Sequence, residues 1–243
     1  MRVPQPSPEQ IILGHRAALA LVRTRVKAFA RTAWVAQGSY RDADIDRLVA
    51  LIVPRVQAGQ LQVANLTSAY IASIATLRGG ALVAPARVNR GIVLDGRGVP
   101  AEDVYRRPAS AVYNGLAEGK SYSDSLALGA LLLGTLIATD MQMSMVRQAR
   151  ESYQAQGVTL YVRVLNGGKN CDLCIDASGK SYHTEDLSPI HPGCSCSTDA
   201  AGTEAPSIDR STLGNPDIEV AVREHGEMGP TLTNAADHFT GPN

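Results

Sequence analysis

All four cysteines of this 243-residue chain lie in one short stretch, between Cys171 and Cys196. Cys171 and Cys174 form a Cys-x-x-Cys pair, and His191 and Cys194 form a His-x-x-Cys pair with the same spacing. Two such pairs supply the thiolate and imidazole donors from which a tetrahedral zinc site is usually built. The spacing therefore predicts that this part of the chain folds around a structural zinc ion.

The stretch offers five donors for four coordination positions, because Cys196 follows Cys194 after a single serine. Residues two apart point to the same side of an extended segment, so either cysteine can complete the site. We favour Cys171, Cys174, His191 and Cys194, with Cys196 as the alternative fourth ligand. Two disulfides are the competing interpretation, but they rarely form in a reducing cytosol.

Residues 158–200 have the pattern of a small module. Residues 158–165 are rich in β-branched and aromatic side chains, which predicts a strand. Residues 166–201 are rich in Gly, Ser, Asp and Pro and hold few large apolar residues, so they cannot bury enough surface to fold alone. We therefore expect 158–200 to be an α+β module stapled by zinc.

Residues 1–84 have the pattern of a basic N-terminal helical region. Apolar residues recur at helical spacing from Pro8 to about Gln37, from Asp42 to about Val56 and from about Gln60 to Leu77. Pro54 marks where the second of these helices ends or kinks. Three helices joined by short loops indicate a bundle.

Residues 85–157 combine an arm with a long helix. Glycines and prolines between residues 84 and 100 break any period and indicate a loop or extended arm. One helix is expected from Ala101 past Pro108 to Gly119, and the longest helix from Ser121 to about Gln156. Leu126 to Ile137 is apolar on nearly all sides, so this first half of the long helix is expected to be buried. Three methionines in its second half are interpreted as packing residues: Met141, Met143 and Met145.

Residues 201–243 carry seven acidic residues against two basic ones and few large apolar residues. Only residues 216–227 indicate a regular element. We expect an acidic extended tail that orders against a neighbouring chain. The whole pattern predicts a mainly α protein: a helical bundle with one long helix, the zinc-stapled module, and an extended C-terminal tail.

The charge is unevenly distributed although the net charge is zero. Residues 1–60 carry nine Lys or Arg against four Asp or Glu, and the interval from Gln10 to Arg41 holds no acidic residue. Such a stretch is either a solvated helix face or a contact surface for nucleic acid or an acidic partner. The candidate contact residues are Arg16, Arg23, Arg25, Lys27 and Arg31.

No secretory signal is visible at the N-terminus, which is rich in proline. The longest uncharged run, between Asp124 and Asp140, is shorter than the roughly 20 apolar residues that a membrane span needs. The sequence therefore predicts a soluble protein with no membrane partner.

The segment from Val162 to Cys196 resembles the MuF-like minor capsid, or head morphogenesis, proteins of tailed bacteriophages. The resemblance lies in Arg-Val-Leu-Asn from Arg163, in the Cys-x-x-Cys pair, in Gly179-Lys180, and in Pro-Ile-His-Pro-Gly-Cys-Ser-Cys from Pro189. It covers the chain from about Ser121 to the end of the cluster.

The resemblance implies a non-enzymatic protein that is made in the host bacterial cytoplasm and incorporated into the virion. It implies a place in the capsid interior or at the portal vertex, in multiple copies around the portal. The implied partners are the portal and major capsid proteins, with possible contact to packaged DNA.

Two motifs raise enzymatic alternatives, His183-Thr-Glu185 and the Cys-x-x-Cys pair. A zinc deaminase would need Pro-Cys-x-x-Cys well downstream, whereas the cysteines here follow closely and are spaced Cys-x-Cys. A redox Cys-x-x-Cys would need a βαβ pattern, which is missing. The strongest alternative is a treble-clef-like, metal-dependent nuclease using His183, and the next is a DNA-binding module that acts through the basic stretch. No nucleophile and base pair supports a protease.

Overall fold

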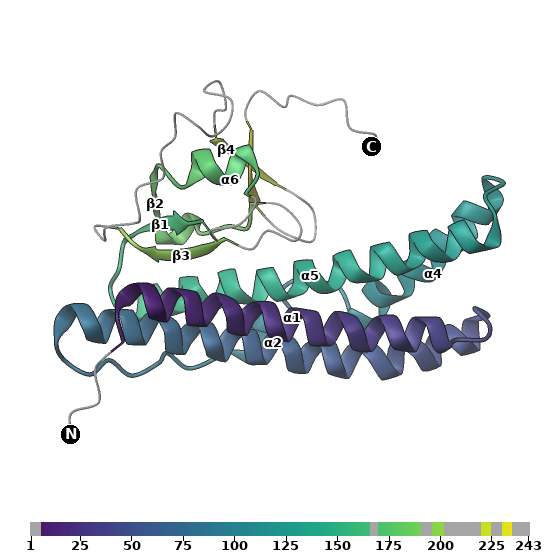
Figure 1. Ribbon diagram of the computed structural model, residues 1–243, viewed down its shortest axis with the longest axis horizontal. Coiled ribbons are helices and arrows are strands. Elements are labelled where there is room, and N and C mark those ends of the chain that lie inside the picture. Colours follow the sequence, from purple (N-terminus) through teal and green to yellow (C-terminus); the bar gives the residue numbers. More distant parts are fainter. Residues whose placement is uncertain (1–5, 166–169, 191–195, 202–219, 225–229, 235–243) are drawn as a thin grey trace.

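The computed structural model describes residues 6–165, 170–190, 196–201, 220–224 and 230–234. Helices form an elongated bundle, and a small sheet lies along one side of it (Figure 1). The helices of the bundle are α1 (Pro8–Ala36), α2 (Asp42–Gly79), α3 (Arg90–Leu94), α4 (Ala101–Ala117) and α5 (Tyr122–Ala155). The predicted mainly α class is confirmed.

The helix ends follow the chemistry of their capping residues. The Ser7 hydroxyl accepts a bond from the backbone N–H of Gln10, whose side chain bonds back to Ser7, and α1 begins there. The Ser121 hydroxyl likewise accepts the backbone N–H of Asp124, so the predicted start of the long helix is confirmed. The C-terminal end of α2 is capped by Gly80. Its φ of 66° is a left-handed conformation, which glycine adopts without strain.

The two helices predicted on either side of Pro54 are one continuous helix, α2, so the predicted helix end near Pro54 was wrong. Proline removes one intrahelical hydrogen bond and costs about 3 kcal/mol. Pro54 is exposed, while a stripe of apolar side chains on both sides of it is buried. Burying one such side chain contributes roughly 1.5–3 kcal/mol. The free energy gained by burying this stripe therefore exceeds the cost of the proline. The buried side chains nearest to Pro54 include Ile52, Val53, Val56 and Val63.

The first half of α5 is less buried than expected. Its first half leaves Leu128 38% and Leu131 69% exposed, whereas every residue from Leu136 to Val146 is buried. In Figure 1 the sheet lies along the second half of α5, whereas the first half lies beside α1 and α4. The packing role of the three methionines is confirmed. By length and composition α5 is also apolar enough to cross a membrane. However, 56% of its 18-residue apolar stretch is buried inside the protein, as in a core helix.

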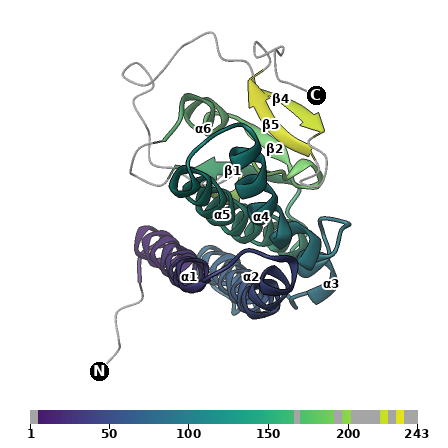
Figure 2. The same ribbon diagram turned by 90° about the vertical axis from the view of Figure 1, so that its right-hand side faces the viewer.

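The sheet contains β1 (Leu160–Val164) between β2 (Ser181–His183) and β3 (Ser197–Ala200), all antiparallel. The predicted strand over residues 158–165 is confirmed as β1. A short helix, α6 (Asp172–Ala177), lies on the side of the sheet away from α5 (Figures 1 and 2). Tyr161 of β1 is fully buried and belongs to the core of the bundle. The sheet and the bundle therefore share one hydrophobic core.

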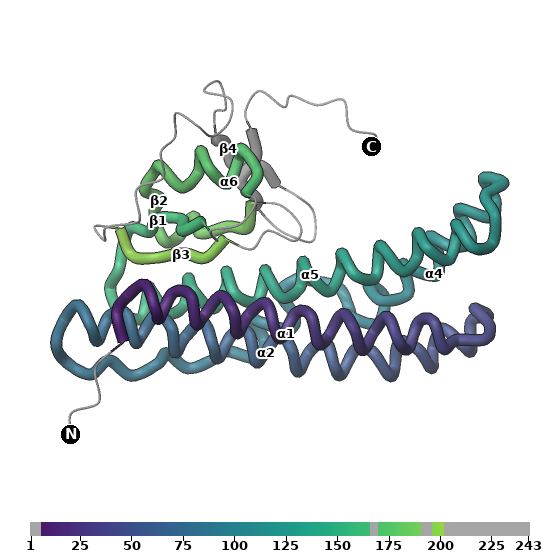
Figure 3. Tube along the Cα trace, viewed as in Figure 1, coloured from purple at the N-terminus to yellow at the C-terminus, as the bar shows by residue number. Residues whose placement is uncertain are grey.

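The two N-terminal regions that the sequence separates, 1–84 and 85–157, pack together. Figure 3 traces α1 and α2 as an antiparallel pair, with α5 running antiparallel to α1. The arm between residues 84 and 100 is irregular as expected, except for α3, whose Val93 is 1% exposed. The buried Val93 therefore attaches the arm to the helical bundle.

Part of the predicted extended tail is a two-stranded antiparallel hairpin. It consists of β4 (Val220–Glu224) and β5 (Pro230–Asn234). β4 falls inside the interval where the sequence indicated a regular element. The rest of the tail, apart from Ala201, lies outside the described residues.

Candidate metal site and the junction beside it

The first predicted ligand pair lies at the start of α6. Cys171 caps this helix, and its Sγ accepts the backbone N–H of Cys174 at 3.4 Å. Cys171 is exposed and Cys174 is 2% exposed. Two cysteines within one helical turn have the Cys-x-x-Cys spacing of a zinc ligand pair. This local geometry is suited to metal binding.

Cys196 lies close to this pair but makes a different contact. Its Sγ is 3.9 Å from Oδ1 of Asn170, in hydrogen-bond geometry. Cys174, Ile190 and Cys196 share a small apolar cluster that is separate from the main core. The cluster therefore gathers the three chain segments that carry the predicted donors, since Ile190 directly precedes His191.

His191 and Cys194 lie outside the described residues. Within the described part of the chain, no three or more His, Cys, Asp or Glu side chains form a group that could hold a metal ion. In that same part, no disulfide joins Cys171, Cys174 and Cys196 to one another. The zinc site thus stays a prediction, of which the structure describes one half.

A buried arginine positions the segment that leads to His191. Arg163 of β1 is 2% exposed, and its guanidinium donates to the backbone carbonyl of Ser188. It also lies over the ring of Tyr161, 5.7 Å from the ring centroid. Arg163 belongs to the motif behind the family resemblance, and this contact gives it a structural role.

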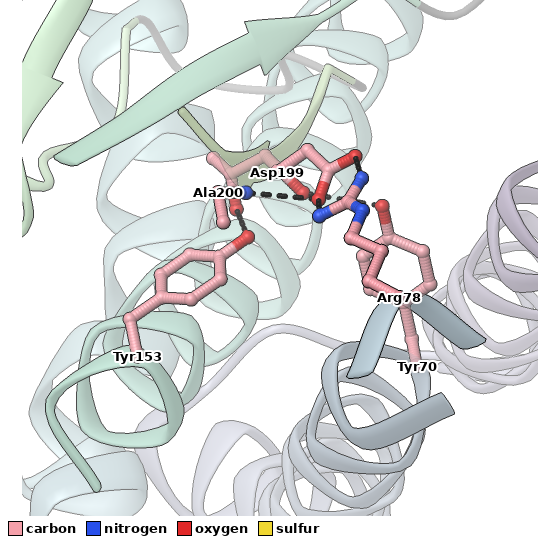
Figure 4. A network of polar contacts seen from close by, with 6 residues as sticks. Tyr70, Arg78, Tyr153, Asp199 and Ala200 are labelled. Atoms are coloured by element: carbon pink, nitrogen blue, oxygen red, sulfur yellow. Dashed lines mark hydrogen bonds and ion pairs between the residues drawn. The ribbon is translucent and has the colours of Figure 1, made fainter. Parts of the chain in front are cut away.

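Five polar residues, which we call the bundle–sheet junction, join α2 and α5 to β3: Tyr70, Arg78, Tyr153, Thr198 and Asp199. Figure 4 labels Tyr70, Arg78, Tyr153 and Asp199. Arg78 donates two bonds to Asp199, at 3.1 and 2.7 Å. The hydroxyls of Tyr70 and Tyr153 donate to the backbone carbonyl and to Oγ1 of Thr198, each at 3.3 Å. A two-bond arginine–carboxylate pair fixes orientation as well as distance. The junction thus fixes the sheet at one position on the bundle.

The environment keeps the two tyrosines of the junction protonated. Burial raises the pKa of Tyr70 and Tyr153, and the charge of Asp199 raises both further. A phenol that stays neutral remains a hydrogen-bond donor. Both hydroxyls therefore donate throughout the ordinary pH range.

His15 of α1 lies beside the junction in an apolar position. Its ring stacks on Tyr70 with centroids 4.2 Å apart, and the residue is 7% exposed. Neither ring nitrogen has a hydrogen-bond partner among the described residues. Burial, and next the charge of Arg16, lower the pKa of His15 to about 4. His15 is therefore neutral near pH 7.

The five basic candidates of α1 do not form one surface. Arg16 is half-buried, and its Nε donates to Ser197 Oγ of β3 at 3.3 Å, so it supports the sheet. Arg23 is also half-buried, whereas Arg25 is exposed. Lys27 and Arg31 are exposed and line an open groove between α1 and α5. Only this last pair shares a recognisable surface feature.

His183, the residue of the nuclease alternative, is exposed at the end of β2. It lines a shallow pocket of about 310 Å³ together with Val158, Thr184 and Glu185. Among the described residues, no metal-binding group of three or more side chains includes His183. This surrounding gives no support to a second metal centre.

Sequence reasoning missed a second buried ionic cluster, on α5. Asp140 accepts bonds from Arg97 Nε at 2.6 Å and from the Tyr105 hydroxyl at 2.7 Å, and it is 5% exposed. These bonds attach the arm and α4 to α5. A signal existed, because Asp140 is a lone acid in an otherwise uncharged helical stretch and a buried charge requires partners. Asp199 had no comparable signal.

Comparison with known proteins gives no match to any protein family, to any curated protein or to any solved structure.

Proposed function

We propose that this chain is a non-enzymatic minor capsid, or head morphogenesis, protein of a tailed phage, with a structural zinc site. The observation that carries the proposal is the proximity of Cys171, Cys174 and Cys196. These cysteines come from two separate parts of the motif behind the family resemblance, and the fold brings the two parts together. The shared core and the bundle–sheet junction support a scaffold, because they hold the module rigidly on a long helical body.

The proposed ligands are Cys171, Cys174, His191 and Cys194. Cys196 is the alternative fourth ligand, and its Sγ lies within hydrogen-bond distance of Asn170 Oδ1. Zinc would supply the stabilisation that the small apolar cluster around these residues does not provide.

Metal analysis of the purified chain tests the zinc site. We expect one zinc per chain, lost in Cys171→Ser and Cys174→Ser, with unfolding confined to residues 166–200. The matched control is Cys196→Ser, which removes a thiol from the same cluster and should keep the metal. A metal-free protein whose cysteines form disulfides would contradict the proposal, and loss of zinc in Cys196→Ser would reassign the fourth ligand.

The proposed partners are the phage portal and major capsid proteins, and the proposed location is the capsid interior or the portal vertex. Packaged DNA is a possible further contact. A mass-spectrometric inventory of purified virions should find several copies of the chain per particle. If the chain is made during infection but does not appear in particles, the capsid assignment fails.

A plasmid-nicking assay with magnesium or manganese tests the nuclease alternative. We expect no cleavage by the wild-type protein and no difference in His183→Ala. Cleavage that disappears in His183→Ala would replace the scaffold by an enzyme.

A further inference from the structure

An open groove runs between the second half of α1 and the first half of α5. Its volume is about 840 Å³, and it extends from Thr24 to Gln37 on α1 and from Leu126 to Ile137 on α5. At a rise of 1.5 Å per residue, these stretches are roughly 17–20 Å long. We call this feature the α1–α5 groove.

Small side chains make the groove. Its walls present Ala28 on α1 and Ala127, Ala130 and Gly134 on α5. The helices therefore leave an elongated hollow between them. Its floor includes Trp34 and Leu133, each 3% exposed.

The rims of the groove are apolar and exposed. Val35 is 72% exposed on the α1 side, and Leu131 is 69% exposed on the α5 side. Contiguous apolar surface on a protein usually marks an interaction site. This also accounts for the unexpected exposure of the first half of α5.

The groove carries positive charge only. Lys27 and Arg31 are exposed along its α1 wall, and none of the residues that line it, all within the described part of the chain, is acidic. Lys27 reaches across the hollow, since a methyl group on Gly134 would lie 3.2 Å from its Cε. The two cations therefore sit beside the apolar floor, where a partner's carboxylates would meet them.

We propose that the α1–α5 groove binds an apolar helix of a partner protein whose flanks carry Asp or Glu. A hollow between two helices, three to four turns long, matches a third helix that packs lengthwise. The carboxylates would pair with Lys27 and Arg31 at the rim. The inference rests on the proposed function, because it names the surface through which the bundle meets a larger assembly.

Other occupants fit the groove less well. A second copy packed groove to groove would bring two cationic surfaces together, which repel. A flat bilayer surface cannot reach Trp34 and Leu133 on a concave floor. A nucleic acid would use the cations but would leave the apolar floor and rims unmatched.

Tryptophan fluorescence gives a direct readout, because Trp34 lines the groove and is the only tryptophan in the chain. The probe is a synthetic helical peptide of about 18 residues, with Leu along one face and Glu on both flanks. The control peptide carries Lys in place of Glu. We expect the Glu peptide to bind and shift the Trp34 emission, more weakly as salt rises, and the Lys peptide to bind at least about tenfold more weakly.

Matched variants locate the binding. Lys27→Glu with Arg31→Glu, and separately Leu131→Ser, should each weaken the Glu peptide about tenfold. Arg25→Glu and Leu82→Ser are the controls, since both residues are exposed and neither lines the groove. They should change affinity less than about twofold. Because all five positions are exposed, circular dichroism should show every variant folded.

Equal binding of the two peptides, or no binding at millimolar concentration, would overturn the proposal. So would groove variants that abolish self-association or binding to duplex DNA or to phosphatidylglycerol vesicles while leaving the peptide unaffected. The particle inventory is measured separately. If the chain binds the peptide but is not found in particles, only the capsid function is refuted. If the chain is found in particles but does not bind the peptide, only the proposed role of the groove is refuted.

Discussion

Two glycines of α5 have opposite surroundings and make a matched pair. A methyl group on Gly129 would lie 2.5 Å from Cζ2 of Trp34 and 2.8 Å from the carbonyl oxygen of Pro108. The same group on Gly134 would meet only the flexible end of Lys27, at 3.2 Å. Alanine favours a helix over glycine by up to about 1 kcal/mol. We therefore expect Gly134→Ala to stabilise the protein by roughly 0.5–1 kcal/mol.

Gly129→Ala should instead destabilise the protein by about 1–3 kcal/mol, because overpacking against a backbone oxygen outweighs the gain in helix propensity. Urea denaturation of both variants gives the two free energies of unfolding. Changes of the same sign in the two variants would contradict the different packing of these positions.

His15 should make the stability depend on pH. Its pKa is about 4 in the folded chain against 6.5 for an ordinary histidine. Between these values the unfolded chain binds a proton that the folded chain does not, so stability falls as pH decreases. The contribution is complete above pH 6.5 and is lost as pH falls towards 4. The expected loss from this residue between pH 7 and pH 5 is about 2 kcal/mol.

His15→Phe keeps a ring against Tyr70 and removes the titration. The difference in unfolding free energy between wild type and variant, measured at pH 7 and pH 5, isolates the histidine from the carboxylates. Parallel pH profiles would show that His15 is not the responsible group.

At the scale of the helix, Pro54 predicts a simple gain. It lies exposed in the middle of α2 and removes a backbone hydrogen bond without packing in the core. Pro54→Ala restores the donor and relieves the clash with the preceding turn. We expect a stabilisation of about 1–3 kcal/mol and a higher Tm in calorimetry. A destabilised variant would mean that the proline bends α2 into its proper packing.

The sequence predicted helices where local chemistry decides and failed where tertiary packing decides. Ser121 and Gly79-Gly80 mark true helix ends because capping is local. Pro54 did not end a helix because the buried stripe around it outweighs one lost bond. The apolar first half of α5 was expected to be buried, but periodicity does not tell which side of a helix other elements cover.

The same distinction holds at the candidate site. The spacing of Cys171 and Cys174 predicted that the two thiols lie within one turn, and they do so at the start of α6, while their role as metal ligands stays a prediction. Arg16 was predicted as a partner contact, yet it bonds Ser197, far away in sequence. The bundle–sheet junction depends entirely on such distant pairs, and its members resemble ordinary surface residues of α2, α5 and β3. A single sequence carries no information on which of them meet.

At the scale of the molecule, the opposite charges of its two ends suggest separate tasks. The described residues that form the main core all precede residue 202. The tail beyond that point carries seven acidic residues against two basic ones, while the first 60 residues carry nine basic against four acidic. A segment that is rich in charge and poor in large apolar residues is suited to contacts with another chain.

Truncation after Ala201 should therefore separate folding from assembly. We expect the truncated chain to keep its helical circular dichroism, its zinc and a Tm within a few degrees of wild type, because the bundle, its core and the bundle–sheet junction remain intact. Its incorporation into particles, measured by mass spectrometry, should fall severalfold. A truncated chain that unfolds would show that the β4–β5 hairpin completes the fold, and undiminished incorporation would leave the helical bundle as the assembly surface.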